Sequence, residues 1–265
     1  MPDDCLHREA QCYADLWVPR LLPYYEDFVC KSAPKAGERV LIASVGPGAA
    51  LRAVTNAMDG RGELAATDSS PAMIEMSRDE LSDTNAQMPI RLEVTDAHDT
   101  LNRQWDLILH SFRLWDLPDQ LGTLRCWRRA VEPAGRVALL VWGPSDPESP
   151  FEKLSIALRQ TEPTVAPLDN AWHIAARQPM RNLLGQAGLK LVRHATVRHP
   201  MEFASAEGFF AAMTKEFQLL RIVQRLGTKR TARVADAFFA LLDPPSPRTP
   251  IAFAPSATIV IADPN

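Results

Sequence analysis

Residues 39–48, Arg-Val-Leu-Ile-Ala-Ser-Val-Gly-Pro-Gly, have the pattern of an apolar strand that runs into a glycine-containing turn. Glycine has no Cβ, so its backbone reaches left-handed conformations and can approach a ligand closely. In an open α/β sheet such a turn lies at the carboxyl end of the strand, where nucleotide-like cofactors bind. A Gly-Pro-Gly turn that binds nothing is an equally common interpretation, so the rest of the chain must decide.

Strand-like and helical segments alternate on the carboxyl side of this turn. The expected strands are residues 39–44, 63–67, 90–95, 106–111, 136–142, 189–197 and 253–262. The expected helices include residues 49–58, 71–81, 119–131 and 180–187. Short apolar strands separated by helices indicate a mostly parallel sheet with helices on both faces. The predicted fold class is therefore α/β, Rossmann-like and doubly wound.

The chain divides into three predicted segments: an N-terminal helical cap at 1–37, a core at 38–145, and the C-terminal half of the same domain at 146–265. Apolar residues spaced three to four apart predict helix in the cap, with interruptions at Pro19 and Pro23. Residues 205–242 are expected to form two helical stretches, the first of which ends at Gly227. They would form a helical lid at about 200–250, ahead of the final strand.

Composition excludes several classes of protein. The 265 residues are 46% hydrophobic and carry a formal net charge of -3, which gives no global attraction for nucleic acid or an anionic membrane. The four cysteines have no metal-binding spacing, so no metal cofactor is expected and free thiols in a reducing compartment fit best. The N-terminus lacks the pattern of a signal peptide, and no apolar run is long enough to span a bilayer. These features predict a cytoplasmic protein.

Two aspartates follow the next predicted strands and would share an edge of the sheet with the glycine turn. Asp68, after the second strand, could accept hydrogen bonds from the vicinal hydroxyls of a ribose. Asp96, after the third, could accept one from an adenine amine. Each could instead cap a helix. Dinucleotide binding is disfavoured because Leu51 stands where the fingerprint requires a third glycine, and no Gly-Lys-Ser/Thr follows the turn as a P-loop requires.

Several longer motifs fit one family. The pattern V-L-D-x-G-x-G-x-G is matched by residues 40–48, an acid followed by Ser-Pro-x-Met by 68–73, an acid-alanine pair by 96–97, the F-D-x-V-x-x-x-F and L-P-D patterns by 105–119, and Arg-Arg-x-Leu-x-Pro-Gly-Gly-Arg by 128–136. Residues 36–143 thus resemble the core of class I S-adenosylmethionine-dependent methyltransferases, of the ubiquinone/menaquinone-biosynthesis type that acts on small molecules. The resemblance implies a seven-stranded sheet whose last strand inserts antiparallel beside the sixth.

The resemblance also implies a cofactor site for S-adenosylmethionine, with S-adenosylhomocysteine as the product. Its predicted residues are Ser44, Gly46, Gly48, Asp68, Ser69, Met73, Asp96, Ala97, His110 and Ser111. The chain departs from the family at Ile42, which replaces an acidic residue, and at Ser44, which replaces the first glycine. These departures leave a second hypothesis open, in which a degenerate relative binds another ligand, catalyses a reaction other than methylation, or serves as a partner subunit.

Methyl transfer requires a general base only where the acceptor must lose a proton. His110, at the end of the fourth strand, is the predicted base, although a structural histidine is an equally good interpretation. Tyr13, Trp17 and Trp115 are the predicted substrate contacts. The expected partner is a small-molecule acceptor, with neither nucleic acid nor membrane insertion, and homodimer formation is left open.

The predicted lid carries a basic run made of Lys215, Arg221, Arg225, Lys229, Arg230 and Arg233. Such a run could attract an acidic substrate. A solvated helix face is the favoured interpretation, because charges on one side of a surface helix usually face water. Aromatic residues of the cap and the lid suggest an apolar acceptor, whose identity the sequence does not give.

Overall fold

The computed structural model describes residues 10–82, 88–144, 146–165, 175–215 and 217–265. Seven strands form one sheet in the order β3-β2-β1-β4-β5-β9-β6. They are β1 (Arg39–Ala43), β2 (Glu63–Asp68), β3 (Ile90–Val94), β4 (Trp105–Ser111), β5 (Val131–Trp142), β6 (Leu189–Arg198) and β9 (Ser256–Pro264). Strand β9 pairs antiparallel with both β5 and β6, and the strands from β3 to β5 are parallel. This is the predicted Rossmann-like fold, with the last strand inserted as expected.

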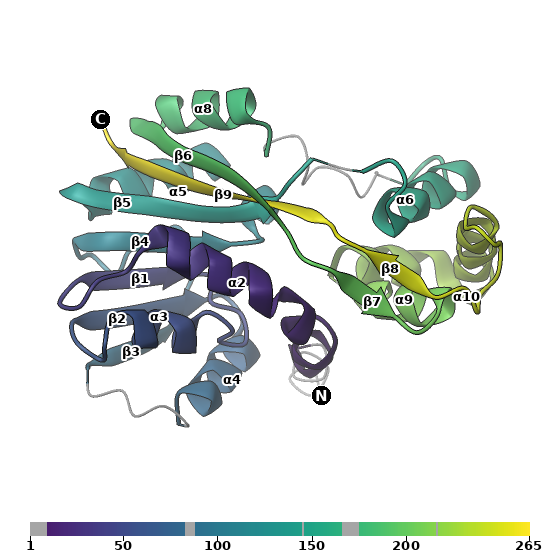
Figure 1. Ribbon diagram of the computed structural model, residues 1–265, viewed down its shortest axis with the longest axis horizontal. Coiled ribbons are helices and arrows are strands. Elements are labelled where there is room, and N and C mark those ends of the chain that lie inside the picture. The colour runs from purple at the N-terminus through teal and green to yellow at the C-terminus, as the bar shows by residue number, and fades with distance from the viewer. Residues whose placement is uncertain (1–9, 83–87, 145, 166–174, 216) are drawn as a thin grey trace.

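Helices cover both faces of the sheet (Figure 1). One apolar cluster joins the sheet to α2 (Val18–Ser32), α3 (Leu51–Ala57) and α4 (Pro71–Ser82), and the other joins it to α5 (Gln120–Ala130) and α8 (Arg177–Gln186). Neighbouring residues of β1 alternate between these clusters, with Ile42 in the first and Leu41 in the second. This alternation is why the central strands are apolar on both sides.

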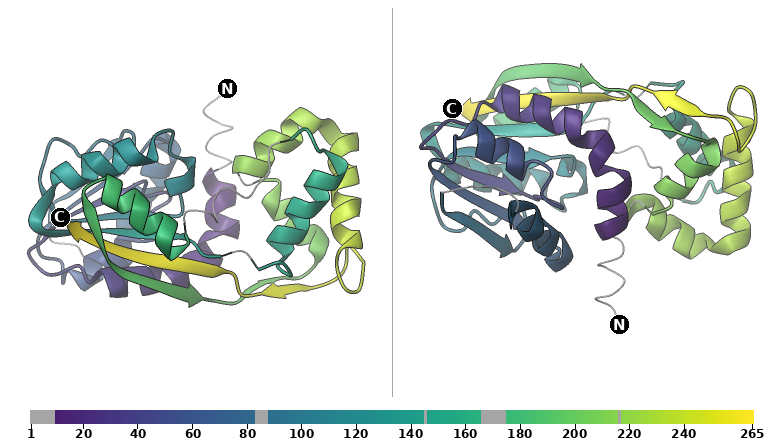
Figure 2. Two further views of the ribbon diagram at one scale, coloured as in Figure 1. Left: turned by 90° about the horizontal axis from the view of Figure 1, so that it is seen from above. Right: turned by 60° about the horizontal axis from the view of Figure 1, so that its bottom comes forward.

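A second lobe lies beside the sheet and is made of α6 (Pro150–Thr161), β7 (Met201–Phe203), α9 (Ala206–Met213), α10 (Phe217–Ala240) and β8 (Ile251–Phe253). Strands β7 and β8 form their own antiparallel pair. Figure 2 shows that the chain passes between the lobes along two neighbouring paths, from β6 to β7 and from β8 to β9. Side-chain caps start its helices: Ser149 accepts from the amide of Glu152 and Ser205 from that of Gly208.

Some predicted boundaries were wrong for physical reasons. The final strand is split at Pro255, because proline has no N–H for the ladder and restricts the residue before it. The first helical stretch of the lobe already ends at Met213. The predicted helix end at Gly227 is confirmed within α10, where the non-helical φ of 72° and ψ of 168° separate two helices that meet at a kink. Pro23 lies inside α2, which continues through it. Within the described ranges, no helix is both long and apolar enough to cross a membrane.

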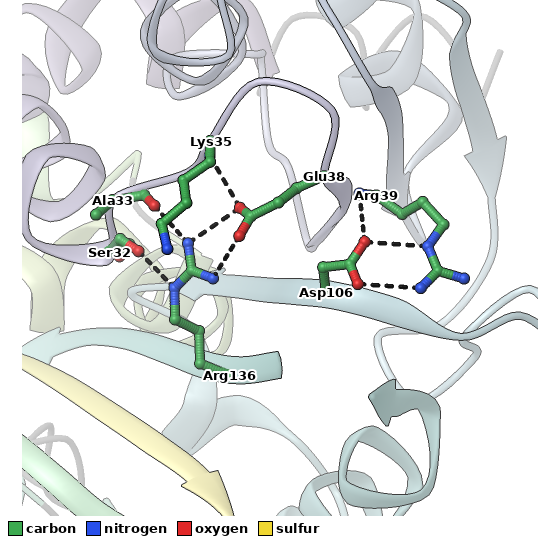
Figure 3. A network of polar contacts seen from close by, with 7 residues as sticks. All are labelled: Ser32, Ala33, Lys35, Glu38, Arg39, Asp106 and Arg136. Carbon is green, nitrogen blue, oxygen red and sulfur yellow. Dashed lines mark hydrogen bonds and ion pairs between the residues drawn. The ribbon is translucent and has the colours of Figure 1, made fainter. Parts of the chain in front are cut away.

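A polar network anchors the carboxyl end of α2 to the edge of the sheet (Figure 3). The guanidinium of Arg136 on β5 donates hydrogen bonds to the carbonyl of Ser32 (2.7 Å), to the carbonyl of Ala33, and to the carboxylate of Glu38 (2.9 and 3.1 Å). Both charged side chains are only 16% exposed. Since α2 also reaches the candidate site described below, this network fixes one wall of that site.

Replacing this arginine tests the anchor. We expect Arg136→Gln to lower the free energy of unfolding by about 2 kcal/mol, because it leaves partly buried acceptors without donors. Urea denaturation measures the effect. Arg61→Gln is the control: Arg61 pairs with Asp59 at the surface, with a side chain 69% exposed, and should change stability by less than about 0.5 kcal/mol. Equal effects of the two substitutions would contradict the anchoring role.

Candidate active site

A cavity of about 320 Å³ opens where β1, β2, β4 and β5 end, between the sheet and the second lobe. Many of the predicted site residues line it: Tyr13, Trp17, Ser44, Gly46, Asp68, Ser69, Met73, Ser111 and Trp115. Its remaining wall comes from α2, the loop after β4, α6, α9 and α10. The volume is within the usual range for small-molecule sites. The cavity thus joins the glycine turn to the aromatic residues of the cap and the second lobe.

The turn after β1 is built from left-handed residues. Ser44 has φ 60°, Gly46 has φ 60° and Gly48 has φ 95°. A Cβ on Gly48 would lie 3.2 Å from the Cα of Ser77, so a side chain there would push α4 away. The hydroxyl of Ser77 in turn donates a 2.8 Å hydrogen bond to the carbonyl of Gly46. Two of the three positions therefore carry glycine for steric reasons, while Ser44 is strained.

Asp68 lies at the end of β2, facing this turn. Its carboxylate accepts hydrogen bonds from the amide of Gly46 (3.0 Å) and from the amide of Ser70 (2.9 Å). Burial raises the pKa of Asp68, and the two amides partly oppose that shift. A carboxylate has about four acceptor sites, so sites remain for hydroxyl groups of a ligand. The arrangement fixes an acceptor pair within reach of the turn, as a ribose requires.

Three hydroxyl groups meet on the side of the cavity where β4 ends. Tyr25 of α2 hydrogen-bonds with Ser111 and with Tyr13, and burial raises the pKa of Tyr25. The Tyr25 ring packs edge-on against Phe112, with ring centroids 5.8 Å apart. The only sequence signal for Tyr25 is its place on the apolar face of the cap helix. This cluster supplies neutral donors and acceptors to the cavity.

His110 does not line the cavity, so the structure does not support the prediction that it is the general base. Its side chain is fully buried, its Nδ1 lies 2.9 Å from the carbonyl oxygen of Ala43, and its ring packs on Trp127 at 5.0 Å. Strand alternation explains this placement, since neighbouring Ser111 faces the cavity while His110 faces the α5 side. Burial lowers the pKa of His110 to about 4.

Other predicted residues lie outside the cavity wall. Asp96 is exposed beyond the end of β3, and the carbonyl of Ala97 accepts a 2.8 Å hydrogen bond from the indole of Trp127. Their role in holding an adenine stays a prediction. Ile42 is 2% exposed and packs in the apolar cluster under α2 and α3. The position where the family has an acid is thus occupied here by a core side chain.

Three charged residues of the cavity, Arg113, Asp116 and Arg221, escaped the sequence analysis as site residues. Arg113 follows β4 by two positions, and Arg221 belongs to the basic run on α10 that was interpreted as a solvated face. Arg221 reaches the cavity because α10 packs against α6, whose Phe151 and Ser155 also line it. Across the described residues, no group of three or more His, Cys, Asp or Glu side chains could hold a metal ion.

Comparison with known proteins agrees with this geometry. Residues 40–135 match the model of a family described as "Methyltransferase domain". Over 133 residues the chain is 31% identical to the aklanonic acid methyltransferase DauC of a Streptomyces species, covering 49% of this chain and 60% of the relative. Over 120 residues it is 28% identical to the ubiquinone/menaquinone biosynthesis C-methyltransferase UbiE of Burkholderia vietnamiensis, covering 44% of this chain and 49% of the relative.

Among solved structures, the YcgJ protein of Bacillus subtilis superposes with a TM-score of 0.61 at 15% identity, covering 91% of this chain and 98% of that structure. Identity this low establishes the fold alone. The strand order and the site at the strand ends define an α/β cofactor-binding domain. Residues 40–135 match this family model and both curated relatives are methyltransferases, so the core is similar to class I S-adenosylmethionine-dependent methyltransferase domains. The chain spans 60% or less of the length of either curated relative.

The strain at Ser44 gives a first prediction. We expect Ser44→Gly to raise the free energy of unfolding by up to about 1 kcal/mol, because glycine adopts a φ of 60° without steric cost. Urea denaturation measures the gain. Ala33→Gly is the control, since Ala33 is also left-handed, at φ 48°, but does not line the cavity. A loss of stability in Ser44→Gly, with a gain in Ala33→Gly, would contradict the strain.

The buried state of His110 gives a second prediction. Its pKa is about 4 in the fold and 6.5 in the unfolded chain. Between these values the unfolded chain binds a proton that the native protein does not, so stability falls as the pH falls through this window. From pH 7 to pH 5 the contribution of His110 to the free energy of unfolding should fall by about 2 kcal/mol. The His110→Gln variant lacks this contribution, so its free energy of unfolding should fall by about 2 kcal/mol less than that of the wild type. Equal losses in both proteins would show that His110 titrates normally.

Proposed function

We propose that the protein transfers a methyl group from S-adenosylmethionine to a small, largely apolar acceptor. The observation that carries the proposal is the single cavity in which the turn at Ser44–Pro47 and Asp68 meet the aromatic side chains of Tyr13, Trp17 and Trp142. The first set suits a nucleoside, and the second suits an apolar ring system. Both curated relatives are named for small molecules, which supports an acceptor of this kind.

The residues present fit this cofactor. The turn leaves its backbone open at Gly46, where a Cβ would meet nothing within 4 Å, and the Asp68 carboxylate is already aligned by the amides of Gly46 and Ser70. We assign Asp68 to the ribose hydroxyls, Asp96 to the adenine, and Ser44, Ser69 and Met73 to further contacts. When bound, S-adenosylmethionine supplies an electrophilic methyl group on a positively charged sulfur.

The protein's own contribution to the reaction is positioning and exclusion of water. Holding a nucleophile in line with a methyl group converts a bimolecular step into a unimolecular one, which accounts for a large share of such barriers. We assign Tyr13, Trp17 and Trp115 to the acceptor, and we propose that the second lobe is a lid over it. The hydroxyl groups of Tyr25 and Ser111 would orient an acceptor oxygen or pass its proton on, in place of His110.

A second candidate function keeps the fold without methylation, and the substitutions at positions 42 and 44 favour it. Ile42 supplies no carboxylate, and Ser44 adds a Cβ to the cavity wall. Such a protein would bind another ligand, catalyse a different reaction or act as a partner subunit. For either function we propose a cytoplasmic location, supported by the free thiols of Cys12, Cys30 and Cys126, which suit a reducing compartment.

Calorimetry with S-adenosylhomocysteine tests the proposed function. We expect the wild-type protein to bind this product, and Asp68→Ala to lose at least about tenfold in affinity, because charge-assisted hydrogen bonds to the ribose are removed. Asp59→Ala, an acidic residue exposed at the surface, is the control and should bind like the wild type. An absence of heat and of thermal stabilisation at millimolar product would refute cofactor binding and favour the second candidate.

A further inference from the structure

The cavity wall, made of aromatic, aliphatic and small polar residues, contains two arginines, Arg113 and Arg221. Arg113 is neutralised within the fold, since its Nε lies 3.2 Å from the carboxylate of Asp116. Arg221 makes no hydrogen bond or ion pair with another residue of the described chain. Its side chain therefore brings an uncompensated positive charge to the cavity from the second lobe.

The carboxylates that line the cavity are already engaged. Asp68 accepts from the amides of Gly46 and Ser70, and Asp116 pairs with Arg113. A guanidinium offers five donors in a planar fork that matches a carboxylate, and it keeps its charge at any ordinary pH. With no acidic side chain of the described cavity wall left for Arg221, its natural partner is an anionic group on a ligand.

We propose that Arg221 binds a carboxylate in this cavity and that the methyl acceptor supplies it, so that the acceptor is an aromatic acid. This inference rests on the proposed function and names the class of its substrate. The rings of Trp17, Phe151 and Trp142 form the apolar part of the site, with centroids 6.3 Å apart between Trp17 and Phe151 and 6.0 Å between Trp142 and Phe151. They would hold the ring system while Arg221 fixes its charged end.

The position of Arg221 suits a residue that selects the substrate. It lies on α10 before the bend at Gly227, close in sequence to Leu219, which also lines the cavity. Arg225, one helical turn further on, is exposed and does not line the cavity. Arg221 and Arg225 belong to the same basic run, but of these two residues only Arg221 lines the cavity.

Two probes of nearly equal shape test the proposal, one acidic and one neutral. We expect the wild-type protein to bind 2-naphthoate about tenfold more tightly than 2-naphthamide. The measurement is made at low ionic strength, because the side chain of Arg221 is exposed and salt would screen its charge. Arg221→Gln should abolish this preference and bind both probes alike, and Arg225→Gln should keep it. Quenching of the fluorescence of Trp17, Trp115 and Trp142 at the cavity reports the binding.

A second arm separates the two sources of a carboxylate, because the cofactor's amino-acid end also carries one. S-adenosylhomocysteine should bind wild type and Arg221→Gln with equal affinity. A tenfold loss in this arm would overturn the proposal by assigning Arg221 to the cofactor, and so would equal wild-type affinities for acid and amide. If the wild type binds no S-adenosylhomocysteine yet prefers 2-naphthoate through Arg221, the proposed methyl transfer fails while the carboxylate site stands.

Discussion

The hydrogen bond from the amide of Gly46 to the carboxylate of Asp68, 3.0 Å long, links the ends of two neighbouring parallel strands. It requires a turn that leaves β1 in left-handed conformations, and that turn is possible because Gly48 has no Cβ to collide with α4. The same bond holds a partly buried carboxylate in place, against the cost of its burial. The part of the cavity at Gly46 and Asp68 is therefore a consequence of how the strands end.

The aromatic part of the cavity depends on how the second lobe is held. The hydroxyl of Tyr24 on α2 donates to the carbonyl of Pro255 (2.6 Å) and also lies 3.0 Å from the carbonyl of His199. These two carbonyls belong to two of the connections between the lobes, β8 to β9 and β6 to β7. Within the lobe, Arg230 and Arg233 of α10 donate to Glu162 after α6, whose side chain is 4% exposed. Members of the basic run thus serve different purposes, because each meets a different neighbour.

The seven strands could be predicted from local signals, namely apolar runs bounded by turns. The antiparallel insertion of β9 and cavity residues such as Ser69 and Met73 came from the family resemblance. The prediction of His110 as a cavity residue failed. The face of the sheet on which a side chain at the end of a strand lies depends on the strand's register, and a shift of one residue moves it to the opposite face. The sequence analysis also missed Tyr25 and Arg221 as cavity residues. Their helices are recognisable from periodicity, but the direction of a helix face is set by tertiary packing.

The departures at positions 42 and 44 have different physical weight. Ile42 is a well-packed core residue, so an aspartate in its place would put a charge among apolar side chains and destabilise the fold. Ser44 lines the cavity and has a strained backbone at φ 60°. A glycine there would both relieve the backbone strain and enlarge the space for a ligand. Ser44→Gly is expected to change the turn with a gain in stability, so its affinity for S-adenosylhomocysteine can be compared with that of the wild type. An aspartate at position 42 would instead destabilise the fold, and a loss of binding there could come from unfolding.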